Sequence, residues 1–339
     1  MKKLQNSLYV TRQGAYIHKE RETIVIEQER KKLMQVPIHS VSGLFCFGNV
    51  LVSPALMGFC GEKGVNLAFF TEYGRFYGRL QGKKSGNVLL RRAQYHADEL
   101  QTLEIARSCV AAKLVGARNV LLRHKRNHGS EDAIEQAVKR LASSVRLARS
   151  VDNLDSLRGI EGDGAATYFS VFENMINAKL RTDFPFAGRN RRPPRDPVNA
   201  LLSFVYSILG QDIGAALNGV GLDPQIGFLH ADRPGRDSLA QDLLEEFRPW
   251  LADRLVLSLI NRRQLKASDF IMESSGAVRL SAEARKQLLV AYQEKKQQEI
   301  THPFLKEKVP IGVVPHIQAM LLARHLRGDL KRYPPCVLR

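Results

Sequence analysis

The short segment Gly82-Lys83-Lys84-Ser85-Gly86 divides this chain of 339 residues into two parts with different hydrophobic periodicity. Before it, short runs rich in β-branched and aromatic residues alternate with polar or glycine-containing breaks, a pattern that predicts β-strands. After it, apolar residues recur about every 3.6 positions to the end of the chain, which predicts helices. The sequence therefore predicts an α+β protein, with a small N-terminal antiparallel β domain followed by a larger all-α domain.

The same patterns predict the individual elements. Strands are expected at 8–10, 15–17, 23–26, 33–36, 44–47 and 66–70, and Ser53-Pro54 predicts a capped helix over 55–63. Helices are expected at 88–126, 131–151, 153–177, 197–218, 238–264, 281–300 and 315–327, with a break near Gly116 in the first of them. We assign 1–87 to the β domain, 88–330 to the helical domain and 331–339 to a C-terminal tail.

The charge of the chain indicates an anionic partner. Lys and Arg number 51 and Asp and Glu 34, so the formal net charge is +17. Residues 105–130 contain no acidic side chain, and 189–195 hold four arginines in a proline-rich segment. Such clusters bind phosphate groups independently of nucleic-acid sequence. The alternative is a solvated helix face and a flexible linker.

Several protein classes are excluded by the sequence. The longest apolar candidate for a membrane span, 198–210, is shorter than the roughly 18 residues required and contains polar side chains. The first residues lack the apolar core of a secretory signal, so we expect a cytoplasmic protein with no membrane partner. The four cysteines form no Cys-x-x-Cys pair, which predicts reduced thiols. No glycine-rich phosphate loop is present, which argues against a nucleotide-driven motor.

The stretch Gly227-Phe228-Leu229-His230 and the helix predicted to begin at Ser238 contain candidates for chemistry. Asp242 and Glu245 are three residues apart on that helix, beside its apolar stripe. One histidine with carboxylates makes an oxygen-rich site that favours Mn²⁺ or Mg²⁺ over zinc, and its natural chemistry is phosphoryl transfer. The structural alternative is a buried, hydrogen-bonded His230, with the carboxylates paired to Arg248 or Arg236.

Glu161 lies among small residues in the segment 157–169, which contains three glycines and two alanines. Each glycine inside a helix costs about 1 kcal/mol relative to alanine, so something must compensate for it. Close packing of a neighbouring helix is one explanation, and a metal ion bound to Glu161 is the other.

Three motifs in this order resemble a known family. They are Leu157-Arg158-Gly159-Ile160-Glu161-Gly162, then Gly227-Phe228-Leu229-His230, then the stretch from Ser238 to Pro249. Together they resemble the CRISPR-associated integrase and endonuclease of spacer acquisition, the first universal adaptation protein, and the likeness spans almost the whole chain. The resemblance implies that Glu161, His230 and Glu245 are metal ligands and that Asp242 is a further acid of the catalytic set. The neighbouring Glu246 is a second candidate for the third ligand, but the spacing from Asp242 favours Glu245.

The resemblance also implies a reaction, in which the 3′-hydroxyl of a captured DNA fragment attacks a phosphodiester at the end of a repeat, with Mn²⁺ or Mg²⁺ as cofactor. The alternatives are a metal-dependent nuclease without integration and a non-enzymatic helical nucleic-acid scaffold. The partners implied are double-stranded DNA, a second copy bound through the β domain, and a small second adaptation protein of ferredoxin-like fold. Motif spacing most resembles the type I branch, in which an iron–sulfur exonuclease assists. The candidate DNA-binding residues are Arg123, Arg126, Arg189, Arg191, Arg192 and Arg248.

Overall fold

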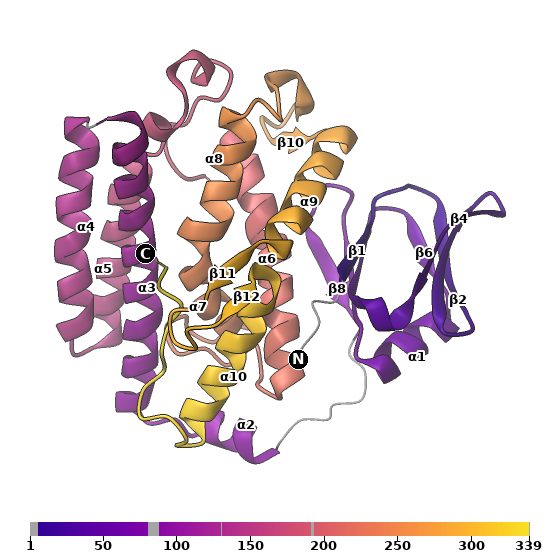
Figure 1. Ribbon diagram of the computed structural model, residues 1–339, viewed down its shortest axis with the longest axis horizontal. Helices are drawn as coiled ribbons and strands as arrows, with labels where there is room; N and C mark the ends of the chain where they lie inside the picture. The colour runs from indigo at the N-terminus through magenta and orange to yellow at the C-terminus, as the bar shows by residue number, and fades with distance from the viewer. Residues whose placement is uncertain (1–5, 81–87, 130, 191–192, 339) are drawn as a thin grey trace. The chain divides into compact units, whose positions relative to one another are not determined.

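The computed structural model describes residues 6–80, 88–129, 131–190 and 193–338. Its contacts divide the chain into two compact units (Figure 1). Unit 1 comprises Met1–Ser85 with Leu280–Gln298, and unit 2 comprises Gly86–Arg279 with Glu299–Arg339. The predicted α+β class, with strands first and helices after, is confirmed. The predicted division differs at 280–298, which we assigned to the helical domain and which groups with unit 1.

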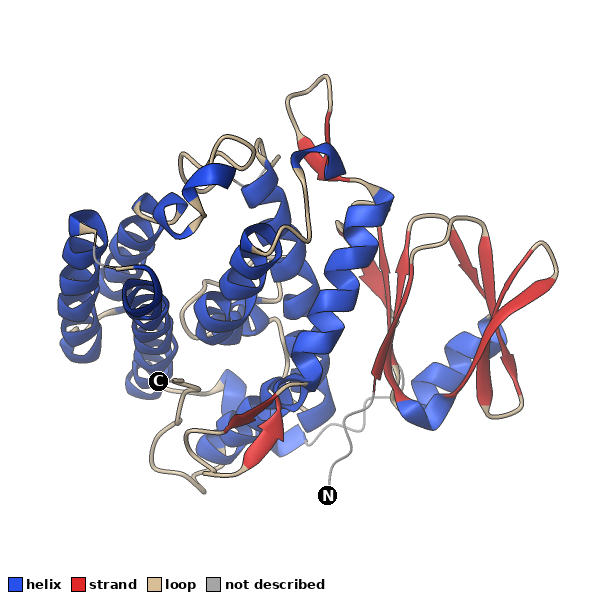
Figure 2. Cartoon of the chain, turned by 45° about the horizontal axis from the view of Figure 1, so that its top comes forward, coloured by secondary structure: helices blue, strands red, loops and turns tan. Residues whose placement is uncertain are grey.

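Unit 1 is built on two four-stranded sheets that share an apolar core (Figure 2). One sheet has the order β1-β5-β7-β8 and the other the order β4-β3-β2-β6. The strands are β1 (Asn6–Val10), β2 (Ala15–Glu20), β3 (Thr23–Gln28), β4 (Lys31–Pro37), β5 (Val41–Phe47), β6 (Val50–Val52), β7 (Asn66–Phe70) and β8 (Phe76–Arg79).

The prediction of a purely antiparallel β domain is wrong. The pairs β1 with β5, β5 with β7 and β2 with β6 run parallel, so both sheets are mixed. Parallel neighbours need a crossover connection, and the one from β5 to β7 contains β6, which pairs in the other sheet, and α1 (Pro54–Lys63). Its predicted cap is confirmed, since the Ser53 hydroxyl accepts from the Leu56 backbone N–H at 3.2 Å. Strand periodicity reports burial, but it contains no information on strand direction.

Helix α9 (Ala282–Gln297) joins unit 1 through a buried arginine. Arg285 is 2% exposed and donates to the Glu72 carboxylate at 2.7 Å and to the Leu280 carbonyl at 3.0 Å. Its guanidinium lies 5.2 Å from the centre of the Tyr73 ring. A buried arginine needs a counter-charge and acceptors, and these contacts supply them to both terminal nitrogens of Arg285 and so connect α9 to the β7–β8 turn.

Replacing this arginine tests that connection. We expect Arg285→Met to lower the free energy of unfolding by about 3 kcal/mol, because Glu72 loses its partner and α9 loses its anchor. Urea denaturation measures the change. The control Lys32→Met removes an exposed ion pair with Glu20 and leaves the unfolding midpoint unchanged; equal midpoints for both variants would contradict the assignment of α9 to unit 1.

Unit 2 is largely helical and has α3 at its centre. This helix contacts α4, α5, α7 and η4. The helices are α2 (Val88–Tyr95), α3 (Glu99–His128), α4 (Asp132–Ser150), α5 (Leu154–Ser170), α6 (Pro197–Val220), α7 (Ser238–Phe247), the π-helical η4 (Arg248–Asp253), α8 (Arg254–Asn261) and α10 (Val314–Leu326). Short strands pair as β9 (Phe270–Met272) with β10 (Val278–Leu280) and β11 (Glu299–Thr301) with β12 (Lys308–Pro310). The 3₁₀ segments of unit 2 are η2 (Glu173–Met175), η3 (Ala178–Leu180), η5 (Ala267–Asp269) and η6 (Ile311–Val313), while η1 (Ile38–Ser40) lies in unit 1.

The predicted break near Gly116 is wrong, because α3 is continuous there. The chain breaks earlier, at Asp98, whose side chain accepts from the Gln101 backbone N–H at 2.7 Å and caps the helix. Gly116 serves close packing instead, since a Cβ added to it would lie 3.4 Å from the ring of Pro249. The helix predicted over 238–264 is interrupted by η4, where Pro249 lacks the N–H of a regular turn.

Helix α6 is long and apolar enough to pass the length and composition test for a membrane span, although the sequence predicted only a short candidate at 198–210. Its 24 residues have a mean hydropathy of 1.4 in the best window, but 72% of that window is buried inside the protein. The helix contacts α7, α8 and α10. It is therefore accounted for as a core helix of unit 2.

Candidate active site

Lys113 on α3 brings two of the predicted metal ligands together. Its ammonium forms an ion pair with Oε1 of Glu161 on α5 and lies 2.7 Å from Oε2 of Glu245 on α7. The lysine is 8% exposed, so the group is largely removed from water. Two glutamates from separate helices thus share one cation.

Glu245 is almost fully buried, at 2% exposure. Burial alone would raise the pKa of this carboxyl, but the guanidinium of Arg248 and the ammonium of Lys113 outweigh burial and lower the pKa to about 2. Nη2 of Arg248 lies 3.3 Å from Oε1 of Glu245. The side chain is therefore a carboxylate at neutral pH. The pairing with Arg248 is the one that the structural alternative expected.

Asp242 organises the loop that contains His230. Its buried carboxylate accepts from the backbone N–H groups of Phe228 at 2.6 Å, Leu229 at 3.0 Å and His230 at 3.0 Å. Nδ1 of His230 lies 2.6 Å from Oδ1 of Asp242. The other ring nitrogen, Nε2, has no partner among the described residues. Asp242 therefore acts as a positioning residue for the imidazole.

Two further features hold this loop over α7. Nε of Arg158 on α5 donates to the Leu229 carbonyl at 2.8 Å. A Cβ added to Gly227 would lie 2.8 Å from the His230 carbonyl oxygen and 2.8 Å from Cβ of Ser238, so only glycine permits the close approach. The Gly-Phe-Leu-His stretch thus forms a turn that packs closely against the start of α7 and requires glycine at its first position.

In their observed positions, the side chains of Glu161, Glu245 and His230 meet only part of what a hard divalent cation requires. Within 6–80, 88–129, 131–190 and 193–338, no group of three or more His, Cys, Asp or Glu side chains is arranged to hold a metal ion. Nevertheless, Glu161 and Glu245 already converge on a cation, the Lys113 ammonium. The histidine also has the arrangement usual for a ligand, with one ring nitrogen held by a carboxylate and the other free.

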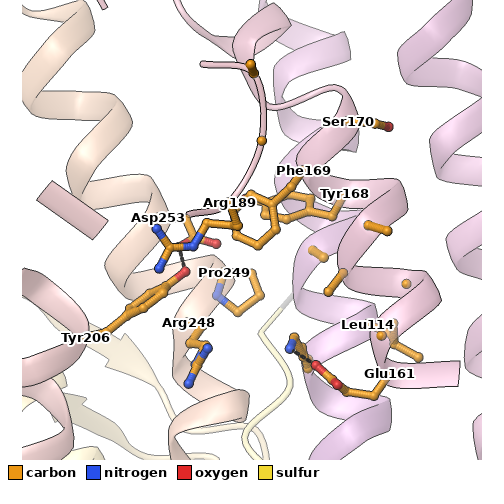
Figure 3. Close-up of a pocket in the computed structure, with 18 residues that line it drawn as sticks. Leu114, Glu161, Tyr168, Phe169, Ser170, Arg189, Tyr206, Arg248, Pro249 and Asp253 are labelled. Atoms are coloured by element: carbon orange, nitrogen blue, oxygen red, sulfur yellow. Dashed lines mark hydrogen bonds and ion pairs between the residues drawn. The ribbon is translucent and has the colours of Figure 1, made fainter. Parts of the chain in front are cut away.

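A cavity of about 460 Å³ borders Glu161 and Lys113 (Figure 3). Arg189 and Arg248 contribute positive charge to its wall, and both guanidinium groups lie over the ring of Tyr206, at 5.3 and 4.6 Å from its centre. The lining residues are Lys113, Leu114, Ala117, Glu161, Gly162, Gly164, Ala165, Ala166, Tyr168, Phe169, Ser170, Ala187, Gly188, Arg189, Tyr206, Arg248, Pro249 and Asp253. The cavity is wide enough for part of a nucleotide.

One small residue of α5 bears out the close packing that the sequence left open as an explanation. A Cβ added to Gly164 would come within 2.2 Å of the Leu114 side chain, so this glycine allows α3 and α5 to pack closely. Gly162, by contrast, has nothing within 4 Å of an added Cβ and lines the cavity beside Glu161.

Comparison with known proteins identifies the family. A model of the family described as CRISPR associated protein Cas1 matches residues 8–294. The chain belongs to the Cas1 family. A protein of Rhodospirillum rubrum named CRISPR-associated endonuclease Cas1 2 is 50% identical over 342 residues, 99% of both chains. One of Chlorobaculum tepidum, named CRISPR-associated endonuclease Cas1 1, is 49% identical over 344 residues and the full length of both. This chain is thus a member of a family of CRISPR-associated endonucleases.

Other similar proteins extend the comparison. A Geobacter sulfurreducens protein named as a fusion of exonuclease Cas4 with endonuclease Cas1 is 36% identical over 98% of this chain and 60% of its own length. Among solved structures, a casposase bound to integration product has a TM-score of 0.83 at 22% identity, covering 99% of this chain and 95% of its own. A Cas1 protein from Thermotoga maritima has a TM-score of 0.80 at 23% identity, with 95% and 97% covered. A chain of a Cas6-RT-Cas1–Cas2 complex has a TM-score of 0.83 at 21% identity, and the match covers 99% of this chain and 36% of that one. These structures share the fold of the Cas1-family chain.

Glu246, the second candidate ligand in this Cas1-family chain, faces away from Glu161. Its carboxylate accepts from the Tyr333 hydroxyl at 2.6 Å, from Nε2 of Gln318 at 2.9 Å and from the Cys336 backbone N–H at 2.8 Å. Burial raises its pKa to about 7, although these donors oppose the shift. Tyr333 and Cys336 are 3% and 0% exposed, so the segment predicted to be a tail is packed behind α7.

The predicted DNA-binding residues fall into three groups. Arg189 and Arg248 line the cavity, Arg123 and Arg126 are exposed on the last turns of α3, and Arg191 and Arg192 lie outside the described residues. The cysteines Cys46, Cys60, Cys109 and Cys336 are free and buried.

Sequence reasoning did not single out Lys113 or Asp253 for the site. Asp253 is buried, accepts from the Tyr206 hydroxyl at 2.5 Å, and has its pKa raised to about 6 by burial against the opposing effect of the arginines. A signal for Lys113 existed, because it falls on the face of α3 that carries Val110 and Ala117, and a lysine in an apolar stripe must have a partner.

The contacts of Glu246 generate a stability prediction. Glu246→Ala leaves the Tyr333 hydroxyl and the Cys336 N–H without their acceptor in the interior and removes one of the acceptors of Gln318, so we expect the free energy of unfolding to fall by about 3 kcal/mol. Urea denaturation measures the loss, and limited proteolysis should show earlier cleavage near 330–336. Glu135→Ala, which removes exposed ion pairs with Lys125 and Lys139, is the control and should match the unaltered chain. An equally stable Glu246→Ala variant would show that the network contributes nothing.

Proposed function

We propose that this chain is the metal-dependent integrase and endonuclease of CRISPR adaptation that joins the 3′-hydroxyl ends of captured DNA to the repeat array. Glu161, His230 and Glu245 are the proposed ligands of Mn²⁺ or Mg²⁺. The observation that supports the proposal is the convergence of Glu161 and Glu245 on one cation, beside an arginine-lined cavity. A histidine presented by Asp242 lies in the loop next to α7.

The reaction is a transesterification. The attacking 3′-oxygen forms a new bond to phosphorus, and the bond from phosphorus to the 3′-oxygen of the nucleotide that flanks the repeat breaks. The proton of the attacking hydroxyl passes to solvent, and the departing 3′-oxygen takes up a proton from solvent. One phosphodiester replaces another, so no nucleotide hydrolysis is needed. A bound divalent cation supplies Lewis acidity for the attacking and leaving oxygens.

Each residue of the chain has a proposed part. Glu161 and Glu245 provide carboxylate oxygens from α5 and α7, and Asp242 orients His230 so that Nε2 faces outward. Arg248 and Arg189 offer guanidinium groups to the charge that grows on the phosphate oxygens. Arg248 is well placed for this purpose, because Tyr206 and Glu245 hold it beside the ligands.

The partners follow from the same family. Binding to Cas2 is supported by the Cas1–Cas2 complex of the same fold, and an exonuclease partner by the Cas4 fusion. We propose that unit 1 joins two copies, because two insertion points at opposite ends of a repeat require two catalytic subunits. Exposed Arg123 and Arg126 are proposed to bind DNA phosphates, together with Arg191 and Arg192. The free, buried cysteines are consistent with a reducing, cytoplasmic location. The spacing of the three motifs supports assignment to a type I system.

Removing one ligand tests the proposal. Glu161→Gln should reduce Mn²⁺-dependent strand joining by about a thousandfold or more, because a carboxylate ligand is lost while the shape is kept. The assay supplies Cas2, a labelled DNA fragment with free 3′-hydroxyl ends and a plasmid that contains a repeat, and it measures covalent attachment of the label. DNA binding, measured by gel shift, should change little.

A matched control lies two residues away. Asp163→Asn removes an exposed carboxylate on the same helix, paired with Arg140, and should join strands at the unaltered rate. Undiminished joining by Glu161→Gln would refute the proposal. Degradation of the label without attachment, by the unaltered chain, would favour a metal nuclease that does not integrate.

A second measurement separates an enzyme from a nucleic-acid scaffold. Mn²⁺ at about a hundred times its dissociation constant should stabilise the folded chain by about 2.7 kcal/mol, because the ion binds only the folded site. Differential scanning calorimetry with and without MnCl₂ detects this as a raised melting temperature. Glu245→Gln should abolish the rise, and a melting temperature insensitive to Mn²⁺ in the unaltered chain would favour the scaffold.

A further inference from the structure

Lys113 is the member of the site that the proposed function does not use. Its side chain is 10% exposed, and its ammonium lies between the two glutamates proposed as metal ligands. We propose that a divalent cation enters this site by displacing the Lys113 ammonium, which then binds a DNA phosphate in the adjoining cavity. This inference rests on the proposed metal-dependent function.

The ammonium and a divalent cation compete for the same carboxylates. Lys113 contacts Oε1 of Glu161 and Oε2 of Glu245, one oxygen on each of the two proposed ligands. Two cations a few ångströms apart in a buried site repel each other by several kcal/mol at an effective dielectric constant of about 20.

Lys113 is the cation that can leave, whereas Arg248 is held. The Arg248 guanidinium donates to Oε1 of Gln241 at 3.2 Å and lies 4.6 Å from the centre of the Tyr206 ring, in addition to its contact with Glu245. In the described part of the chain, the Lys113 ammonium contacts only the two glutamates. Four methylene groups allow it to swing without moving α3.

The cavity gives the displaced ammonium a destination. Lys113 lines the cavity together with Arg189 and Arg248. Once released from the glutamates, its ammonium would be a third cation facing the interior of the cavity. A lysine ammonium is a strongly hydrated point charge that suits a phosphate oxygen. Metal and DNA would therefore bind with positive coupling. By thermodynamic linkage, each would raise the affinity of the chain for the other by the same factor.

Metal affinity gives a test that does not depend on catalysis. Titration calorimetry of the full chain with MnCl₂ should show Mn²⁺ binding about tenfold tighter or better in Lys113→Met, since the competing cation is gone; tenfold equals about 1.4 kcal/mol. Lys125→Met, on the same helix but in an exposed ion pair with Glu135, should bind Mn²⁺ as the unaltered chain does. Equal or weaker binding in Lys113→Met would overturn the displacement. Failure of the unaltered chain to bind Mn²⁺ would instead refute the proposed metal site itself.

A second test needs no variant, so it remains decisive if Lys113→Met folds poorly. Lysine acylation followed by mass spectrometry should modify Lys113 slowly in the metal-free chain and several times faster with Mn²⁺. Duplex DNA with 3′-dideoxy ends, which cannot react, should restore protection in the presence of Mn²⁺. Lys113 equally protected with and without Mn²⁺ would overturn the proposal, as would acceleration that DNA does not reverse.

Discussion

The site depends on the need of a buried carboxylate for donors. Asp242 has no exposed surface, and four N–H groups from the loop 228–230 point at its two oxygens. Burying a carboxylate costs several kcal/mol unless such donors compensate for it. The same set of bonds therefore places the loop, orients the imidazole and keeps α7 in register with it. Glu245, one turn later on α7, then lies toward α3 and α5.

Cations and neutral hydrogen-bond donors together explain how four buried acidic groups and the partly buried Glu161 can coexist in unit 2. Glu245 is matched by Lys113 and Arg248, Asp242 by backbone N–H groups and His230, and Glu246 by neutral donors. The Asp253 carboxylate accepts a hydrogen bond from the Tyr206 hydroxyl, and Glu161 forms an ion pair with the same Lys113 ammonium as Glu245. The net charge of +17 of the chain is thus a property of its surface, while the interior of the site is balanced residue by residue.

Sequence periodicity could predict which residues form strands and helices, because it reflects which side chains are buried. It could not predict strand direction or the partner of α9, since both depend on contacts between distant segments. Gly116 shows the same limit. A glycine in a helix indicates a break, but in the structure this glycine leaves space for the ring of Pro249. For the site, spacing and the family resemblance singled out Glu161, His230, Asp242 and Glu245, and in the structure Glu161 and Glu245 meet at Lys113 while Asp242 contacts His230; their catalytic roles stay predictions. Lys113 was missed because its basic neighbours on α3 made it look like part of a solvated face.

The packing of the C-terminal segment against Glu246 has a consequence for synthesis. The partners of this carboxylate at Tyr333 and Cys336 are 87 and 90 residues away in sequence. A ribosome therefore completes α7 well before it makes the segment that satisfies the buried side of that helix. Until then, a glutamate next to a proposed metal ligand lacks two of its donors. The buried side of α7 can therefore be fully hydrogen-bonded only after residues 333–336 have been made, so completion of the fold around this helix depends on a segment 87 to 90 residues further along the chain.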